Sequence, residues 1–384
     1  MRTSAWLAAV AVIMAALVVG QSVAIRPKWH ELERRNYDFR QYVRDFAKVY
    51  NSDHEYEERR ALFNERLREI YLHNADETQS WKKGVNKFTD RFESEMNAMQ
   101  GYSKAMGFLS RADDANFRAT PLTKEERRIL ASLPENVDWR EQNVVSDVKD
   151  QGNCGSCWSF AAAETIESHW AIATGYLGVL SEQNILDCTA NPYECGGSGG
   201  CQGATCELAF SQIQSSGIAS EWTYPYISYQ GNNMPSCGFN ASSTPPVAQI
   251  TGYTKLPTNR YLPIMEAVAT KGPLAVTVDA SAWSSYESGV FDGCNQANPD
   301  LNHAVQLVGY GTDAELGPYY LVRNSWGDWG EEGYIRLARS MSGECGTDTN
   351  PLDGTGCQGG PDSVFVCGTC GIWYDTSYPF VSTD

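Results

Sequence analysis

The sequence predicts an α+β protein with more than one structural unit, in which helical segments come first and strands follow. Three observations support this prediction. Charged segments with helical periodicity fill residues 29–74, further helix signals begin at Cys157, and β-rich runs dominate after Leu274. A helical half packed against a β half leaves a cleft between the two layers, where ligands commonly bind.

The N-terminus is typical of a secretory signal peptide covering residues 1–24. Arg2 is followed by an apolar run at positions 5–19 and by the small-x-small sequence Ser22-Val23-Ala24, so we expect cleavage after Ala24. A signal anchor is the alternative, but this run is shorter than the roughly 20 residues needed to span a bilayer. We therefore expect no membrane association after cleavage.

Two helices and a linker are predicted between the signal peptide and residue 132. Aromatic residues at steps of three and four place Phe39, Tyr42, Phe46 and Tyr50 on one face of a first helix. A second helix follows a turn at residues 51–53 and carries Leu62, Phe63, Leu67, Ile70 and Tyr71. Residues 91–120 are irregular, residues 122–130 form a short basic segment, and the whole stretch up to residue 132 resembles a cleavable linker.

Charge and cysteine are distributed unevenly along the chain. Residues 1–132 hold 22 basic and 19 acidic side chains, whereas residues 133–384 hold 8 basic and 28 acidic ones. A surface this acidic repels phosphate backbones and argues against nucleic acid as a partner. All 12 cysteines lie in the acidic part, which suits disulfides in an oxidising compartment of the secretory pathway.

The acidic part predicts helices first and strands second. Helices are expected at residues 157–174, ending at Gly175, at residues 181–187 with Ser181 as N-cap, and at residues 204–215. Strands are expected at residues 274–278, 303–309, 319–323 and 333–338.

The densest chemical feature is the sequence Gln151-Gly-Asn-Cys-Gly-Ser-Cys-Trp-Ser-Phe160. Cys157 stands at the start of the first helix, where backbone N–H groups favour a thiolate nucleophile. His303 heads a predicted strand and can serve as its acid and base, whereas His169 lies too far down the same helix. Asn324 can orient the imidazole ring. Cys154 and Cys157 alone would also suit a redox dithiol or half a zinc site, but no βαβ context or second ligand pair accompanies them.

These residues, with Asn302-His303-Ala304-Val305 and Asn324-Ser325-Trp326-Gly327, resemble the papain-like cysteine peptidases of the cathepsin L type. Upstream, Glu55, Arg59, Phe63, Ile70 and Asn74 match the ERFNIN helix of the corresponding propeptides, although Arg66 stands where Asn is usual. Residues 84–90 match their GxNxFxD motif. The resemblance implies an inhibitory propeptide at 25–132, helical at about 29–100. A two-domain peptidase follows at 133–384, with a helical left domain, a β-barrel-like right domain and the active-site cleft between them.

The resemblance also implies roles for single residues. Cys157 is the nucleophile, His303 the general acid and base, Asn324 the residue that orients the ring, and Gln151 the oxyanion donor. Trp326 shields the contact between Asn324 and His303. No cofactor and no metal is implied.

Disulfide pairing follows from the resemblance in part. It implies the bridges Cys154–Cys201, Cys188–Cys237 and Cys294–Cys370. Cys195, Cys206, Cys345, Cys357 and Cys367 remain, so at least one cysteine besides Cys157 is expected to be unpaired. Residues 341–369 form an insertion relative to papain, to which the sequence assigns no role.

The same matching places a specificity pocket, the second subsite, which binds the residue before the one at the scissile bond. Asp375 would form its floor, and its walls would be Thr205, Cys206, Thr277 and Asn302. A carboxylate at the floor predicts acceptance of Arg as well as Phe or Leu. Two alternatives stay open: Asp375 points to solvent, or Cys206 is bridged to Cys195.

The expected function is that of a monomeric cysteine endopeptidase made as a zymogen, secreted or delivered to a lysosome or vacuole. An endopeptidase is favoured because the occluding His-His pair of exopeptidase relatives is missing. The alternative is a non-catalytic binding or storage protein of the same fold. Protein and peptide substrates, the chain's own propeptide and cystatin-like inhibitors are the expected partners. Asn240 is the sequon available for N-glycosylation, and acid near pH 4–5 is expected to release the propeptide, with Asp90 as a titrating group.

Overall fold

The computed structural model describes residues 26–100, 121–233 and 236–382. The predicted signal peptide and most of the linker therefore lie outside the described residues. Within the described ranges, no helix is long and apolar enough to cross a membrane.

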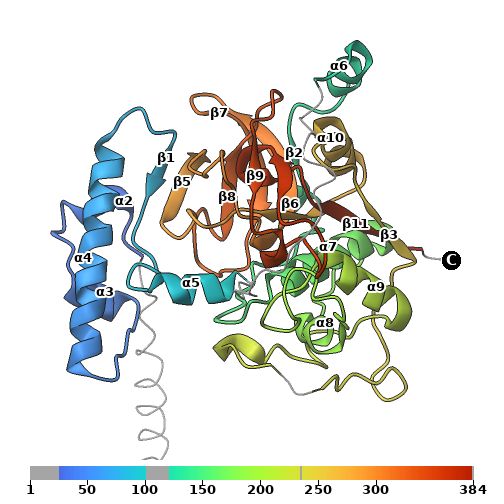
Figure 1. Cartoon of the computed structure of the whole chain (residues 1–384), viewed down its shortest axis with the longest axis horizontal. Coiled ribbons are helices and arrows are strands. Elements are labelled where there is room, and N and C mark those ends of the chain that lie inside the picture. Colours follow the sequence, from blue (N-terminus) through green and yellow to red (C-terminus); the bar gives the residue numbers. More distant parts are fainter. Residues whose placement is uncertain (1–25, 101–120, 234–235, 383–384) are drawn as a thin grey trace, which may run out of the picture.

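The N-terminal segment forms a small helical unit beside the main body (Figure 1). Its helices are α2 (Trp29–Leu32), α3 (Phe39–Asp45), α4 (Asp53–Ala75) and α5 (Glu93–Met99). α3 and α4 bury Phe39, Tyr42 and Phe63 against each other, as their periodicity predicts. The first helix is shorter than expected because Ala47 adopts a left-handed φ of 48° just after it, so Tyr50 approaches from a turn.

The helical half of the main body is built on α7 (Cys157–Thr174), α8 (Glu182–Cys188) and α9 (Cys206–Ser216). α7 ends at Gly175 with a φ of 76°, a left-handed C-cap that glycine adopts without strain. Ser181 caps α8 by accepting the backbone N–H of Asn184. All three predicted helices are present with boundaries within about two residues of the expected ones.

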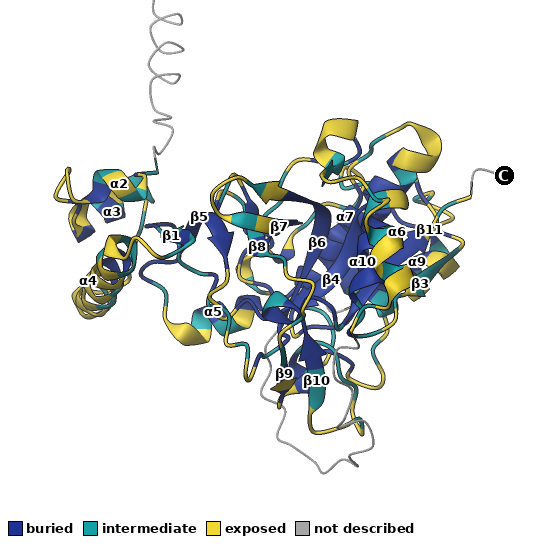
Figure 2. Ribbon diagram, turned by 90° about the horizontal axis from the view of Figure 1, so that it is seen from above, coloured by how far each residue is buried: buried dark blue, intermediate teal, exposed yellow. Residues whose placement is uncertain are grey.

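The β half is one sheet of nine strands with the order β1-β5-β8-β7-β6-β4-β11-β3, with β2 (Val137–Asp138) pairing to β6. Its central strands are β4 (Leu274–Val278), β6 (His303–Asp313), β7 (Gly317–Arg323) and β8 (Tyr334–Ala338), and its other strands are β3 (Gly252–Lys255), β5 (Tyr286–Phe291) and β11 (Thr376–Phe380). β4 and β6 are buried along almost their whole length, as Figure 2 shows. α7 packs against β6, which joins the helical and β halves.

Strand β1 (Trp81–Lys83) of the N-terminal segment completes the edge of this sheet. It pairs antiparallel with β5, with Trp81 opposite Gly289. Trp81 also packs against Phe291 in a tilted arrangement, with 4.6 Å between the ring centroids. The N-terminal segment is thus anchored by backbone hydrogen bonds as well as by side chains.

Several elements were not expected from the sequence. α10 (Tyr261–Thr270) contains Pro263 in its first turn, where proline is tolerated, and α6 (Lys124–Leu130) packs on it through an ion pair between Arg260 and Glu126. The 341–369 insertion forms a two-stranded hairpin of β9 (Cys345–Asp348) and β10 (Val364–Cys367), with the 3-10 helix η3 (Pro351–Asp353) between them.

Candidate active site

Cys157 is the first residue of α7, at the junction of the helical and β halves. Its side chain is buried, and the backbone N–H of Ala304 on β6 is one of the groups near its sulfur. Burial raises the pKa of the Cys157 thiol to about 11, although the N–H groups of Ala304 and Trp158 act in the opposite direction. The sequence predicted an activated thiolate at this helix start. In this structure, the effect of burial on the pKa of Cys157 outweighs that of the helix terminus.

His303 begins β6 and contacts Asn324 through one ring nitrogen. Its Nε2 lies 2.8 Å from Asn324 Oδ1, which also accepts the backbone N–H of Ser325 at 2.8 Å. Because this oxygen acts as an acceptor, the neutral ring carries its proton on Nε2 and leaves the lone pair on Nδ1. Nδ1 has no hydrogen-bond partner among the described residues. Burial lowers the pKa of His303 to about 4, partly opposed by the Asn324 contact.

Three aromatic rings enclose the His303–Asn324 contact. Trp326 lies 4.9 Å from the His303 ring, and Trp283 lies 6.2 Å from it on an edge-to-face contact. Phe88 of the N-terminal segment packs edge-on against Trp326 at 5.4 Å. Trp326 therefore packs against the His303 ring, and its shielding role stays a prediction.

Gln151 is held between the main body and the N-terminal segment. Its Oε1 accepts the hydroxyl of Ser325 at 2.6 Å, and its Nε2 donates to the carbonyl of Met99 at 2.6 Å and to that of Cys154 at 2.8 Å. Met99 is the last residue of α5. A backbone carbonyl of the N-terminal segment therefore occupies the Gln151 side-chain donor, to which the sequence resemblance assigns the oxyanion.

The GxNxFxD segment supports this placement. Asn86 donates to the carbonyl of Ser284 at 2.7 Å, and Lys87 pairs with Asp150 at 2.5 Å. Asp90 is buried and accepts the hydroxyls of Tyr42 at 2.7 Å and Tyr50 at 2.8 Å.

Lys48 supplies the positive partner of Asp90, at 2.7 Å. Burial raises the pKa of Asp90, but Lys48 and the two tyrosines outweigh it and hold the pKa below 3.8. Arg66, the departure from the ERFNIN pattern, donates to the carbonyl of Phe88 at 2.8 Å and so supports the same segment.

Asp375 lies in the interior and not in solvent. Its side chain pairs with Lys255 at 2.6 Å, and Lys255 lies 3.8 Å from Glu207. Burial and then the nearby Glu207 raise the pKa of Asp375 to about 7, against the opposing effect of Lys255. The sequence interpretation missed Lys255 and Glu207. Lys255 carried a signal, because it is the first basic residue after residues 151–254, which contain none.

The predicted pocket walls fall into two groups. Thr277 donates its backbone N–H to the carbonyl of Asp375 at 3.0 Å. Burial and the nearby charges of Glu207 and Asp375 raise the pKa of Cys206, which follows Thr205. Asn302, the fourth predicted wall, accepts the N–H of Ala280 and donates to Ser281 at 2.9 Å. It lines a separate cavity of about 380 Å³ beside α5.

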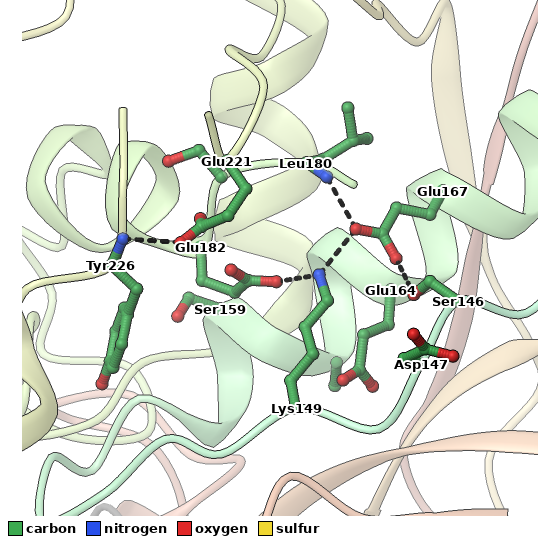
Figure 3. A network of polar contacts seen from close by, with 12 residues as sticks. Ser146, Asp147, Lys149, Ser159, Glu164, Glu167, Leu180, Glu182, Glu221 and Tyr226 are labelled. Atoms are coloured by element: carbon green, nitrogen blue, oxygen red, sulfur yellow. Dashed lines mark hydrogen bonds and ion pairs between the residues drawn. The ribbon is translucent and has the colours of Figure 1, made fainter. Parts of the chain in front are cut away.

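A buried cluster of glutamates lies behind the site (Figure 3). Lys149 pairs with Glu167 at 2.6 Å and also with Glu182, and Arg323, next to Asn324, lies 3.5 Å from Glu164. Burial raises the pKa of Glu164 to about 7 and, together with the charge of Glu182, that of Glu221 to about 7.

Ten of the twelve cysteines form disulfides. The three bridges implied by the resemblance are present, and Cys195–Cys357 and Cys345–Cys367 are two further ones. Because Cys154 is bonded to Cys201, it does not form a redox dithiol or a zinc site with Cys157. Cys157 and Cys206 are free, so Cys206 is not bridged to Cys195. Among the described residues, no cluster of three ligating side chains could hold a metal ion. Asn240 is exposed in a turn.

Comparison with known proteins matches both parts of the chain. Residues 133–355 match the family described as "Papain family cysteine protease", and residues 39–96 match "Cathepsin propeptide inhibitor domain (I29)". Fruit bromelain of Ananas comosus is 38% identical over 321 residues, which cover 82% of this chain and 84% of that protein. Procathepsin L of Rattus norvegicus is 35% identical over 346 residues, covering 88% of this chain and 96% of that one.

Solved structures agree with these relatives. A recombinant stem bromelain precursor superposes with a TM-score of 0.69 at 32% identity, covering 92% of this chain and 99% of that chain. The digestive procathepsin L 3 of Tenebrio molitor larval midgut gives a TM-score of 0.65 at 34% identity, covering 89% and 97%. Both are precursor forms with the N-terminal segment in place. The predicted α+β fold, with its two domains and helical propeptide, is the fold of these structures.

Proposed function

Because the chain belongs to the papain family of cysteine proteases and carries a cathepsin-type inhibitory propeptide, we propose that its mature form hydrolyses peptide bonds through an acyl-enzyme on Cys157. The observation that carries the proposal is the His303 ring: Asn324 Oδ1 accepts the hydrogen bond of its Nε2–H, so Nδ1 is left as a base near the start of α7. No cofactor is required for this chemistry.

In the mature enzyme, His303 Nδ1 takes the proton of the Cys157 thiol, and the sulfur attacks the scissile carbonyl. Gln151 Nε2 and the backbone N–H of Cys157 donate to the oxyanion that forms. The imidazolium then gives its proton to the leaving amine, which departs and leaves a thioester. Water, deprotonated by His303, attacks the thioester and restores the thiol. Asn324 holds the ring in position throughout.

The precursor is inactive because its propeptide occupies the groups that this reaction needs. The carbonyl oxygen of Met99 accepts the hydrogen bond of Gln151 Nε2, and burial keeps Cys157 protonated and His303 neutral. Removal of the segment 25–132 exposes the site to water and lets both pKa values return toward those of an ion pair. The disulfides and the propeptide are consistent with the secretory pathway, and we propose a lysosome, a vacuole or the extracellular space as the destination.

We propose that the enzyme acts as an endopeptidase, as the sequence predicts, on peptide bonds that can reach Cys157 in the cleft. At the second subsite, Lys255 already neutralises Asp375, so we propose preference for apolar side chains there over the Arg acceptance expected from the sequence. Thr205, Cys206, Thr277 and Asn302 remain the proposed walls.

Labelling with a papain-type epoxide tests the proposed reaction. Acid-matured protein should bind one equivalent at Cys157 and hydrolyse peptide substrates, and Cys157→Ala should lose both properties. The unprocessed precursor serves as the second control, since its site is covered. If mature protein neither reacts with the epoxide nor cleaves peptides, the chain is a non-catalytic protein of the same fold.

A further inference from the structure

The 341–369 insertion is fastened to the right-hand wall of the cleft. Its two strands are joined by Cys345–Cys367. Gln296 donates to the carbonyls of Glu344 at 3.1 Å and Gly368 at 3.0 Å, and these two residues flank the hairpin. The Asp348 carboxylate accepts the backbone N–H of Leu301 at 3.3 Å, two residues before His303. The hairpin is therefore a fixed part of the β half.

The same insertion is also fastened to the left-hand, helical half. Cys357 forms a disulfide with Cys195 in the loop that follows α8. Two backbone hydrogen bonds flank it, from Gly196 N–H to Gly356 O and from Gln358 N–H to Tyr193 O, both 2.8 Å long. One short segment thus spans the two halves and is covalently bonded in each.

Residues Pro351–Gly356 pass from the β half to the helical half, and we call them the crossing. Gly354 lies within it. A Cβ atom on Gly354 would lie 1.9 Å from the carbonyl oxygen of Leu301, so its backbone rests directly on the right-hand wall. A Cβ atom on Gly196 would lie 2.7 Å from Gly354 O and 3.0 Å from Ala204 O. Gly354 therefore rests on Leu301 of one wall and lies beside Gly196 of the other, and Gly196 in turn lies beside Ala204, which directly precedes the proposed pocket wall Thr205.

We propose that the 341–369 insertion closes the cleft beyond the second subsite, so that the enzyme accepts only about two residues on the N-terminal side of the scissile bond. This inference rests on the proposed peptidase function. A substrate that places its side chains at Asp375 and Cys157 would have its next residue directed at the Pro351–Gly356 crossing. The substrate class is therefore peptides with a free, nearby N-terminus, from which short N-terminal fragments are released.

Burial and a disulfide both hold the crossing in place. Pro351 and Asp353 are buried, so moving this segment aside would expose side chains that are packed in the closed form. The Cys195–Cys357 bond would still restrict its displacement after the hydrogen bonds had broken. A substrate cannot supply that energy simply by threading another residue into the cleft, because each added residue also loses conformational entropy.

A peptide series tests the proposal on acid-matured enzyme. The peptides share one scissile bond and carry from one to about six residues before it. We expect kcat/KM to be highest with two residues and to fall about tenfold or more when further residues are added. The double variant Cys195→Ser/Cys357→Ser frees the crossing from the left-hand half and should recover most of that loss on long peptides.

The variant Cys345→Ser/Cys367→Ser is the matched control, since it removes a disulfide from the same insertion and keeps the bond to the left-hand half. In this variant, kcat/KM should depend on peptide length as it does in the parent. Equal cleavage of short and long peptides by the parent would overturn the proposal, and so would unchanged discrimination in Cys195→Ser/Cys357→Ser. Epoxide labelling of Cys157 in each variant separates these results from failure of the peptidase function, which would abolish labelling altogether.

Discussion

The Asp90 network offers a quantitative test of how the precursor is kept inactive. Asp90→Asn removes the charge that pairs with Lys48 and accepts the hydroxyls of Tyr42 and Tyr50. Lys48 and Asp90 have side chains that are 18% and 3% exposed, so the substitution leaves a largely buried cation unpaired. Breaking one side of such a pair costs about 3–5 kcal/mol. Even the lower figure raises the fraction of opened propeptide by about a hundredfold.

The direction of the pH effect follows from the lowered pKa of Asp90. A carboxyl group whose folded pKa is depressed contributes stability above its ordinary value, here 3.8, and loses it as the pH falls through the folded pKa. Glu95, whose pKa is lowered from 4.5 by its contacts with Arg59 and the Phe92 N–H against the effect of burial, acts in the same sense. The parent should thus mature rapidly only below about pH 4, a lower window than the sequence suggested.

Maturation of purified precursor, followed on gels between pH 3 and pH 7, measures both effects. Asp90→Asn should mature at pH 5–7 far faster than the parent and show a flatter pH profile. Glu57→Gln is the matched control, because Glu57 forms an exposed pair with Arg60 on α4. If Asp90→Asn and the parent mature at the same rate across this range, the Asp90 network does not hold the propeptide closed.

Three further predictions concern the mature enzyme. Asn324→Ala should lower kcat by about 10- to 100-fold with little change in KM, since it removes ring orientation but no substrate contact; an equal rise in KM would contradict this. Lys255→Met removes the cation that opposes the raised pKa of Asp375, so this carboxyl group should stay protonated and kcat/KM for Arg relative to Leu at the second subsite should not rise; a selective gain in Arg cleavage would contradict this. Glu164 and Glu221 have pKa values raised to about 7, so the stability that they contribute as neutral acids is present below pH 4.5 and lost as the pH rises through 7. Glu221→Gln should therefore reduce the difference in Tm between pH 5 and pH 7.5, and a parent whose Tm is the same at both pH values would refute the assignment.

The sequence predicted the parts of the fold that depend on local signals. The spacing of Phe63, Leu67 and Ile70 marked the buried face of α4, and Gly175 marked the end of α7, because helix period and caps are local properties. The extent of α3 was overestimated because the backbone turns left-handed at Ala47, directly before Lys48, which pairs with Asp90. No periodicity in the sequence records such a tertiary contact.

The site divides in the same way. Cys157, His303, Asn324 and Gln151 stand in recognisable motifs, and the structure gathers them between α7 and β6. The ion pair of Lys255 with Asp375 joins β3 to the segment before β11. It depends on the pairing of two strands that lie about 120 residues apart, and the sequence alone does not predict this pairing. The pairing of Cys195 with Cys357 joins positions separated by 162 residues, and both lie in loops without periodic signals.

The Cys195–Cys357 bond also determines what happens if the mature chain is cut. Residues 240–244 lie in an exposed or half-buried loop between Cys157 and His303, the proposed nucleophile and base, where a protease has access. Of the five disulfides, four would then lie wholly within one fragment or the other, and only Cys195–Cys357 would join the two. A nicked enzyme would accordingly run as one species on a non-reducing gel and as two after reduction. Self-digestion at this loop would yield a two-chain peptidase whose nucleophile and base remain covalently linked.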